Sequence, residues 1–192
     1  MIDFLKTYVK DKRVAVLGFG REGKSTLKQL LIAKGFEKVT ILDKNPIAAE
    51  DIKNICGEAD FPLSQIEIIT GGEYQKSLDD YQVVIKSPGI VLEKDISRYK
   101  TNITSQTELF FEKYRKQIIG ITGTKGKSTT TTLIYHILDN AGYKSVLAGN
   151  IGIPAFDIAD KVEKDTIIVF EMSSHMLEYM KVSPHIGVFL NI

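Results

Sequence analysis

The stretch QIIGITGTKGKSTTTTLI, residues 117–134, decides the fold of the region around it. Its apolar segment, residues 118–121, enters a glycine-rich turn that opens into residues with helical apolar spacing. That spacing places five apolar residues on one face of the predicted helix, namely Leu133, Ile134, Ile137, Leu138 and Ala141. Glycines let backbone N–H groups close around phosphate oxygens, and a helix N-terminus adds the positive end of its dipole. We therefore predict a strand, a phosphate-binding turn and a helix.

The residues of this turn point to a nucleoside triphosphate. Lys127 is expected to reach the β- and γ-phosphates, and the hydroxyl of Ser128 is expected to bind Mg²⁺. The strict P-loop spacing is absent, because Ile121 stands where that pattern needs a glycine, so a plain tight turn remains the alternative. Four threonines at 129–132 favour binding, since β-branched residues are poor helix formers. The predicted ATP-binding set is Gly123, Thr124, Lys125, Gly126, Lys127, Ser128 and Thr129.

Composition excludes several classes of protein. The chain has 192 residues, which is long for one domain and short for two. A net charge of +1 gives no electrostatic reason to expect binding to nucleic acid or to a membrane surface. Cys56, the only cysteine, excludes an internal disulfide framework and is expected to be a buried thiol. With no membrane-length apolar run and no secretory segment in residues 1–13, we expect a cytoplasmic protein.

The first part of the chain carries a second glycine turn. A continuous apolar strand, residues 13–17, runs into Gly18-Phe19-Gly20-Arg21-Glu22-Gly23, and a helix follows. The next strand, residues 39–42, ends at Asp43, which lies 20 residues after Gly23 (43 − 23). This is a Rossmann-like fingerprint in its proper context, although the cofactor need not be NAD. Asp43 is either a ligand of a ribose or base, or a cap for the turn at 45–46.

Three later strand ends carry candidate site residues. An apolar strand at 83–85 leads to Ser87-Pro88-Gly89, which is either a ligand-facing turn or only a structural one. A strand at 145–147 precedes Gly149-Asn150, whose amide could contact a ligand. A buried strand at 166–170 ends at Glu171, the position expected for a Mg²⁺-holding acid, with a helix cap as the alternative.

These motifs resemble the Mur ligase family. The matching segments are GFGREG at 18–23, SPGI at 87–90, TGTKGKSTTT at 122–131, AGNIGIP at 148–154 and FEMSSHMLE at 170–178. They occur in family order and cover essentially the whole chain. The resemblance implies an α/β protein with a Rossmann-like, parallel-sheet UDP-binding domain at 1–114. It also implies, at 115–192, the N-terminal and incomplete part of a P-loop α/β ATP-binding domain.

The resemblance also implies roles for single residues. Lys127 and Glu171 would be catalytic, with Lys127 on the ATP phosphates and Mg²⁺ held by Ser128 and Glu171. Asn150 and the Ser173-Ser174 turn would meet the muramoyl part of the substrate. The UDP and substrate set is Gly18, Phe19, Gly20, Arg21, Glu22, Gly23, Asp43, Lys44, Ser87, Pro88, Gly89, Asn150 and Ser173.

The implied activity uses ATP and Mg²⁺ to add D-glutamate to UDP-N-acetylmuramoyl-L-alanine through an acyl-phosphate. The expected third domain, which binds the amino acid, lies beyond Ile192, so we expect no full activity from these residues alone. An exposed face of the incomplete second domain could self-associate. The sequence departs from the family pattern at Lys125, often Asn, and at Met176, where a side-chain amide is usual, beside His175.

Three other functions remain open from sequence. A different Mur-type ligase could add L-alanine or a diamino acid. The chain could also be a nucleotide-sugar binding module without catalysis. An NAD(P)-dependent dehydrogenase would use the first glycine turn but would leave the turn around Lys127 unexplained.

Overall fold

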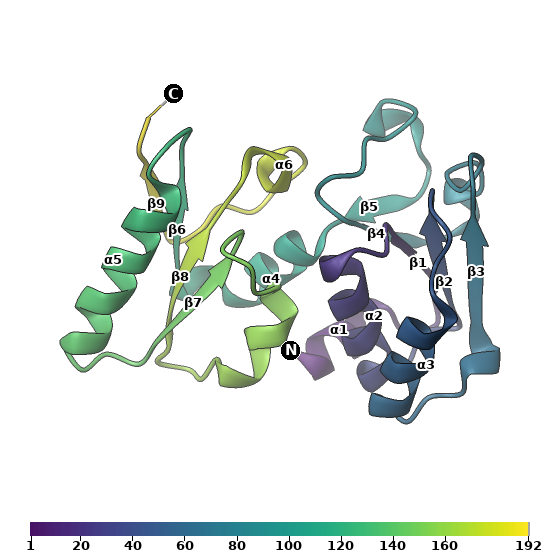
Figure 1. Ribbon diagram of the computed structural model, residues 1–192, viewed down its shortest axis with the longest axis horizontal. Coiled ribbons are helices and arrows are strands. Elements are labelled where there is room, and N and C mark those ends of the chain that lie inside the picture. Colours follow the sequence, from purple (N-terminus) through teal and green to yellow (C-terminus); the bar gives the residue numbers. More distant parts are fainter. Residues whose placement is uncertain (192) are drawn as a thin grey trace. The chain divides into compact units, whose positions relative to one another are not determined.

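The computed structural model describes residues 1–191, and Ile192 lies outside the described residues. The chain divides into two compact units, Met1–Gln106 and Thr107–Ile192, and each has its own parallel β-sheet (Figure 1). This confirms the α/β class. Helix α4 (Gln106–Tyr114) falls almost entirely in the second unit, whereas the sequence placed the boundary between residues 114 and 115. The reason is packing, because Phe110 and Phe111 lie 5.9 and 5.1 Å from Phe170, centroid to centroid.

The first unit has the strand order β3-β2-β1-β4-β5, with every neighbouring pair parallel. Its elements are α1 (Ile2–Tyr8), β1 (Arg13–Leu17), α2 (Arg21–Ala33), β2 (Lys38–Asp43), α3 (Ala49–Glu58), β3 (Ile66–Thr70), β4 (Val83–Lys86) and β5 (Asn102–Thr104). From β1 the sheet grows in one direction through β2 and β3, and the chain then returns to the other side of β1 to add β4 and β5. The switch point lies between β1 and β4. In doubly wound sheets, ligands bind beyond the carboxyl ends of the strands at such a switch point.

The core of the first unit forms where α2 covers β1. Residues 14–17 of β1 are fully buried, as are Leu27, Leu30 and Leu31 on α2, as the helical spacing of those leucines predicts. Cys56 on α3 is a buried free thiol, as expected. The sequence did not predict β5, because its three residues include Asn102 and Thr104 and form no apolar run.

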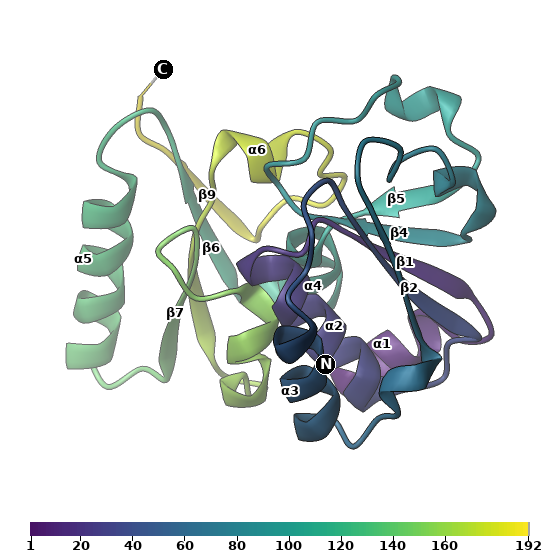
Figure 2. The same cartoon turned by 45° about the vertical axis from the view of Figure 1, so that its right-hand side comes forward.

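The second unit has the strand order β7-β8-β6-β9, again all parallel. Its strands and helices are β6 (Ile118–Thr122), α5 (Lys127–Asn140), β7 (Ser145–Gly149), β8 (Ile167–Glu171), α6 (Ser174–Leu177) and β9 (Ile186–Phe189). Within this unit α5 lies on one side of the sheet, and α4 lies on the other (Figure 2). Within residues 1–191, five 3-10 helices lie at Leu63–Gln65, Leu78–Asp80, Ile96–Arg98, Arg115–Gln117 and Ala155–Lys161.

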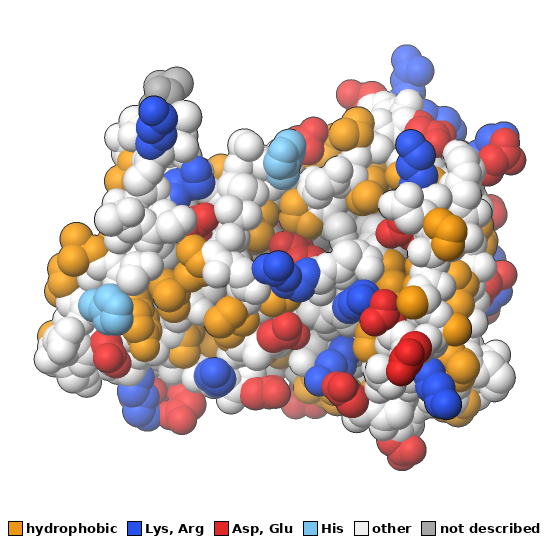
Figure 3. Space-filling view, viewed as in Figure 1, with side chains coloured by type: hydrophobic (Ala, Val, Ile, Leu, Met, Phe, Trp, Pro, Cys, Tyr) orange, Lys and Arg blue, Asp and Glu red, His pale blue; other side chains and the backbone are white. Residues whose placement is uncertain are grey.

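Helix α5 is more exposed than its apolar pattern indicates. Leu133 and Ile137 are 57% and 58% exposed, and the residue of the helix that is buried is Thr131. Hydrophobic side chains accordingly gather on the surface over α5 (Figure 3). The face that carries the apolar spacing is therefore only partly covered by the sheet.

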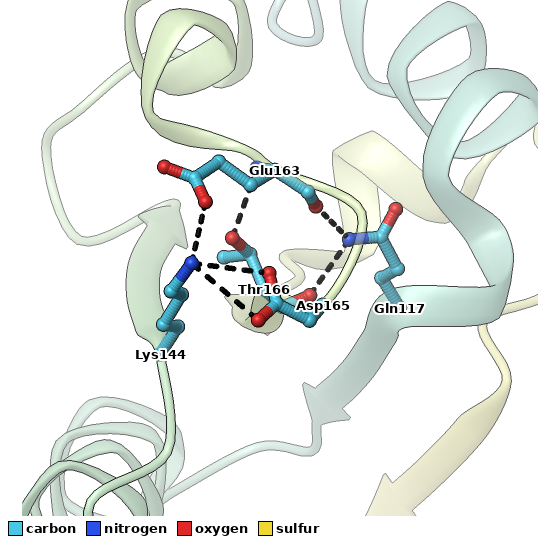
Figure 4. Close-up of polar contacts among 5 residues, drawn as sticks. All are labelled: Gln117, Lys144, Glu163, Asp165 and Thr166. Atoms are coloured by element: carbon cyan, nitrogen blue, oxygen red, sulfur yellow. Dashed lines mark hydrogen bonds and ion pairs between the residues drawn. The ribbon is translucent and has the colours of Figure 1, made fainter.

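Polar contacts tie together the amino ends of three strands in the second unit (Figure 4). Lys144, before β7, pairs with Glu163 at 2.6 Å and with Asp165 at 3.4 Å. Gln117, before β6, donates from Nε2 to the carbonyls of Glu163 and Thr166, at 2.7 and 2.8 Å. These contacts fix the edge of the sheet opposite the glycine turn.

Among residues 1–191, none of the helices has the length and apolar character that a membrane crossing requires.

Candidate functional site

The glycine turn of the second unit lies between β6 and α5, as predicted. Gly126 is the residue before the helix and has a left-handed φ of 84°. Gly126 has no side chain with which to cap α5, and the first N–H groups of a helix have no intrahelical partners. The N-terminus of α5 is therefore ready to receive an anion.

Lys127 is folded over this turn. Its Nζ donates to the carbonyls of Gly123 and Thr124, at 2.9 and 3.2 Å. Thr131 is buried and donates from its hydroxyl to the carbonyl of Lys127, 2.7 Å away, so this threonine supports the helix. Ser128 and Thr129 are exposed at the start of the helix, where a ligand can reach their hydroxyl groups.

Glu171 ends β8 directly beside this turn. It is paired in register with Ile121 of β6 and is only 1% exposed. Asn150 donates from Nδ2 to Glu171 Oε1, at 2.9 Å. Within the described part of the chain, Glu171 Oε2 has no hydrogen-bond partner although it is buried. A buried carboxylate oxygen without a partner is costly, so this atom calls for a donor or a cation.

Glu171 and Ser128 suit Mg²⁺ better than they suit a metal whose ligands must all come from protein side chains. Residues 1–191 contain no group of three or more His, Cys, Asp or Glu side chains that could hold a metal. Mg²⁺ commonly takes one or two protein oxygens and completes its shell with water and substrate phosphates. The buried Oε2 atom of Glu171 and the hydroxyl oxygen of Ser128 are oxygen ligands of the kind that Mg²⁺ prefers.

A pocket of about 480 Å³ opens at this edge of the second unit. It brings together six residues predicted from sequence, namely Gly123, Thr124, Lys127, Asn150, Ser173 and Ser174. Lys125, Gly126, Ser128, Thr129 and Glu171 are not among its lining residues. The sequence missed the other lining residues, which are Thr122, Leu177, Phe189 and Asn191. A polar residue after the strand at 186–189 was the only signal that could have found Asn191.

Two of the departures from the family pattern are placed differently. Met176 is buried and serves packing, whereas His175 is exposed. The hydroxyl of Ser173 accepts from the N–H of Met176, at 3.3 Å, and so caps the short helix α6. Lys125 is exposed within the glycine turn.

The glycine turn of the first unit is held by Asp43. The carboxylate of Asp43 accepts from the N–H of Phe19 at 2.6 Å and from the N–H of Asn45 at 2.8 Å. Close packing explains the last glycine of the turn, because a Cβ on Gly23 would lie 1.9 Å from the carbonyl oxygen of Gly18. Asp43 therefore caps the turn at 45–46, and its role as a ligand of a ribose or base stays a prediction.

The Ser-Pro-Gly turn is joined to the same glycine turn. Ser87 donates from its hydroxyl to the carbonyl of Gly18, at 3.0 Å. Lys86 is 4% exposed, and its Nζ donates to the carbonyls of Ser87, Pro88 and Ile90, at 3.2, 3.3 and 2.8 Å. Sequence reasoning missed Lys86, because nothing in an apolar strand indicates that its last side chain turns back into the following loop.

A pocket of about 330 Å³ lies beside these turns in the first unit. Phe19, Gly20 and Asp43 line it, together with Lys24 and Asp51, which pair at 2.7 Å. Of the other predicted residues, Arg21, Lys44 and Gly89 are exposed, and Gly18 and Gly23 are buried in the turn. Ser87, Pro88 and Gly89 are not lining residues of this pocket.

Glu22 has an unusual environment inside the glycine turn. Burial raises the pKa of its carboxyl from 4.5 to about 7, and the positive charge of Lys86 opposes that rise. Among the described residues, no partner for its Oε2 atom is found. Glu22 is thus a proton-binding group next to the proposed ligand edge.

Comparison with known proteins finds sequence matches over part and over nearly all of the chain. Residues 121–192 match the Mur ligase middle domain. The chain is 35% identical to a UDP-N-acetylmuramoylalanine–D-glutamate ligase of Clostridium botulinum (strain Okra / Type B1), over 97% of this chain and 40% of that protein. A ligase of the same name from Clostridium kluyveri is 34% identical over 99% of this chain and 41% of its own length. The chain thus spans about 40% of the length of these curated relatives.

A solved structure, that of a pseudomurein peptide ligase type C from Methanothermus fervidus, is more distant. It is 20% identical and covers 84% of this chain and 33% of its own, with a TM-score of 0.38 that is too low to carry an argument. The sequence matches carry the relationship. The resemblance of this chain to the Mur ligase family is confirmed, and residues 121–192 match the middle domain of that family.

Proposed function

We propose that this chain supplies the UDP-binding and ATP-binding parts of a ligase of peptidoglycan precursor synthesis. The proposed reaction adds D-glutamate to UDP-N-acetylmuramoyl-L-alanine at the expense of ATP, in the cytoplasm. The observation that carries the proposal is the edge of the second unit, where Lys127, an uncapped helix N-terminus and the unpartnered oxygen of Glu171 adjoin one glycine turn.

In the first step, the terminal carboxylate of the UDP-linked substrate attacks the γ-phosphorus of ATP. ADP leaves, and an acyl-phosphate forms. The ammonium group of Lys127 is within reach of the turn that holds the phosphates and counters the negative charge of the transferring group. Mg²⁺ held by Ser128 and Glu171 would neutralise further charge on the phosphate oxygens.

In the second step, the amine of D-glutamate attacks the acyl carbon of the acyl-phosphate. A tetrahedral intermediate forms and then expels inorganic phosphate, which leaves an amide bond. Asn150 donates to one oxygen of Glu171 and lines the pocket, and these contacts support a role for it in orienting the muramoyl end of the substrate.

The first unit would hold the UDP group. Asp43, Phe19 and Gly20 line a pocket at the switch point of a doubly wound sheet, where such sheets bind nucleotides. The choice of UDP rather than NAD rests on the family relationship. The choice of D-glutamate rests on the names of relatives that are 34–35% identical, so addition of L-alanine or a diamino acid is the second candidate.

Binding of MgADP to the intact protein tests the ATP site. Lys127→Ala should weaken binding at least tenfold, because removing a cation from a phosphate site costs about 1.5–3 kcal/mol. Lys164→Ala, which alters an exposed lysine of the same unit, is the matched control and should bind MgADP as the unaltered protein does. Equal affinities in all three proteins would refute the proposal for this site.

A further inference from the structure

We propose that Asn191 is a positioning residue that holds the phosphate-binding turn at residues 123–126 in its ligand-ready shape. The inference rests on the proposed binding of ATP by that turn. Neither the sequence motifs nor the match to known proteins assigns a role to this side chain.

The carboxamide of Asn191 makes three hydrogen bonds to the turn. Its Oδ1 accepts from the N–H of Thr124 and from the N–H of Lys125, each at 2.9 Å. Its Nδ2 donates to the carbonyl of Lys125, at 3.2 Å. One side chain thus satisfies both polar groups of the Lys125 backbone and the donor of its neighbour.

Only an amide fits this arrangement. The two N–H groups require an acceptor and the Lys125 carbonyl requires a donor, so the partners themselves fix the orientation of the carboxamide. A carboxylate would accept from both N–H groups but would face the carbonyl with a second negative oxygen. A shorter or apolar side chain would leave the N–H and the carbonyl of Lys125 without these partners, and the N–H of Thr124 with only the backbone carbonyl of residue 191.

The end of β9 delivers Asn191 to the turn. Phe189 is the register partner of Thr122, and the next N–H, that of Leu190, donates to the carbonyl of Thr122 at 3.0 Å. The carbonyl of Asn191 then accepts from the N–H of Thr124, at 3.1 Å. The pairing of β6 with β9 therefore continues beyond both strands and sets the position of the turn.

Asn191 accepts from the N–H groups of the turn and not from those of the first turn of α5. It bonds to the N–H groups of residues 124 and 125, which precede the helix, whereas α5 begins at Lys127 after the uncapped Gly126. The N–H groups of the first helical turn are the ones that meet an anion at a helix N-terminus. We therefore infer that Asn191 supports the turn and does not occupy the position that a phosphate group would take.

The test combines two measurements on Asn191→Ala in the intact protein. Hydrogen exchange at the amide of Lys125, without nucleotide, should become faster because its acceptor is lost, whereas the amide of Thr124 keeps the backbone carbonyl of residue 191 as an acceptor. The dissociation constant for MgADP should rise about tenfold, the equivalent of one to two ordinary hydrogen bonds. Asn140→Ala is the matched control, because Asn140 donates to the backbone of the same helix, to His136 at 2.7 Å, but at its far end. It should change neither quantity.

Asn191→Asp provides a second variant should the alanine protein fail to fold. Its carboxylate keeps the two amides protected from exchange, but its negative charge repels phosphate, so MgADP binding weakens and the loss shrinks at high salt. Tighter MgADP binding by Asn191→Ala would show that Asn191 is a plug and would overturn the inference. Unchanged exchange and affinity would also overturn it. Faster exchange in a protein that never binds MgADP would uphold the positioning role and refute the proposed ATP site.

Discussion

Glu22 shows at the scale of one residue how burial shapes the proposed UDP edge. Because burial raises the pKa of Glu22 from 4.5 to about 7, the folded protein keeps this carboxyl protonated over a pH range in which the unfolded chain has lost the proton. The folded state then binds more protons than the unfolded state, so the free energy of unfolding falls as pH rises. The window is pH 4.5 to about 7.

Replacing Glu22 by Gln should remove this dependence. Between pH 4.5 and 7 the unaltered protein should lose stability relative to Glu22→Gln by on the order of 3 kcal/mol at most. Denaturant unfolding of both proteins at several pH values measures the difference, with the exposed Glu50→Gln as a control. A difference that stays constant with pH would show that Glu22 is not titrating as its burial indicates.

Single residues also show what sequence could and could not predict at the site. Lys127, Glu171 and Asp43 were identified because each stands at a strand end or in a glycine turn, where position alone indicates a role. Lys86 and Asn191 were missed, since their partners are backbone groups of turns whose shape depends on tertiary packing. The spacing of residues along the sequence does not reveal such long-range contacts.

At the scale of elements, the approach of β7 to β8 depends on Gly149. This residue has a φ of +96°, and a Cβ there would lie 2.1 Å from the carbonyl oxygen of Glu171. The N–H of Asn150 also donates to that carbonyl, at 3.0 Å. The end of β7 and the position of Glu171 are therefore coupled through backbone contact.

Gly149→Ala should cost more stability than its backbone conformation alone explains. Gly142→Ala is the matched control, because Gly142 has a φ of +82° but nothing within 4 Å of a built Cβ. The control should lose about 1–2 kcal/mol, the cost of a left-handed non-glycine residue, and Gly149→Ala should lose clearly more. Unfolding in denaturant gives both values; equal losses would mean that the backbone contact relaxes freely.

The sequence pattern of each element predicted that the element forms, but it predicted less well which other elements pack against it. The apolar runs predicted at 13–17, 118–121 and 166–170 correspond to β1, β6 and β8 of the parallel sheets, as continuous runs favour. The helical spacing of α5 was correctly interpreted as a helix, but its Leu133 and Ile137 are exposed. Periodicity identifies an apolar face and cannot say which element, if any, covers it.

At the scale of the whole molecule, the second unit is organised around Phe170. This residue is fully buried and packs against Phe110 and Phe111 of α4, which explains why that helix falls in the second unit. Glu171 follows it directly, so the same strand anchors the core and presents the carboxylate. Core packing and site geometry are joined in one element.

Phe170→Ala should destabilise the second unit by about 3–5 kcal/mol, the usual cost of emptying a large aromatic site. Hydrogen exchange should accelerate in α4, β6 and β8. Tyr143→Ala, at a 57% exposed aromatic of the same unit, should cost little by comparison. If both variants lost the same stability, the aromatic cluster would not be the core of this unit.

The central claim is that the first unit recognises a UDP-linked substrate and not a dinucleotide. Calorimetric titration of the intact protein with UDP-N-acetylmuramoyl-L-alanine, with UDP and NAD⁺ as comparators, tests it most directly. The account predicts binding of both UDP ligands and none of NAD⁺. Binding of NAD⁺ without binding of either UDP ligand would contradict it and return the glycine turn at 18–23 to a dinucleotide-binding role.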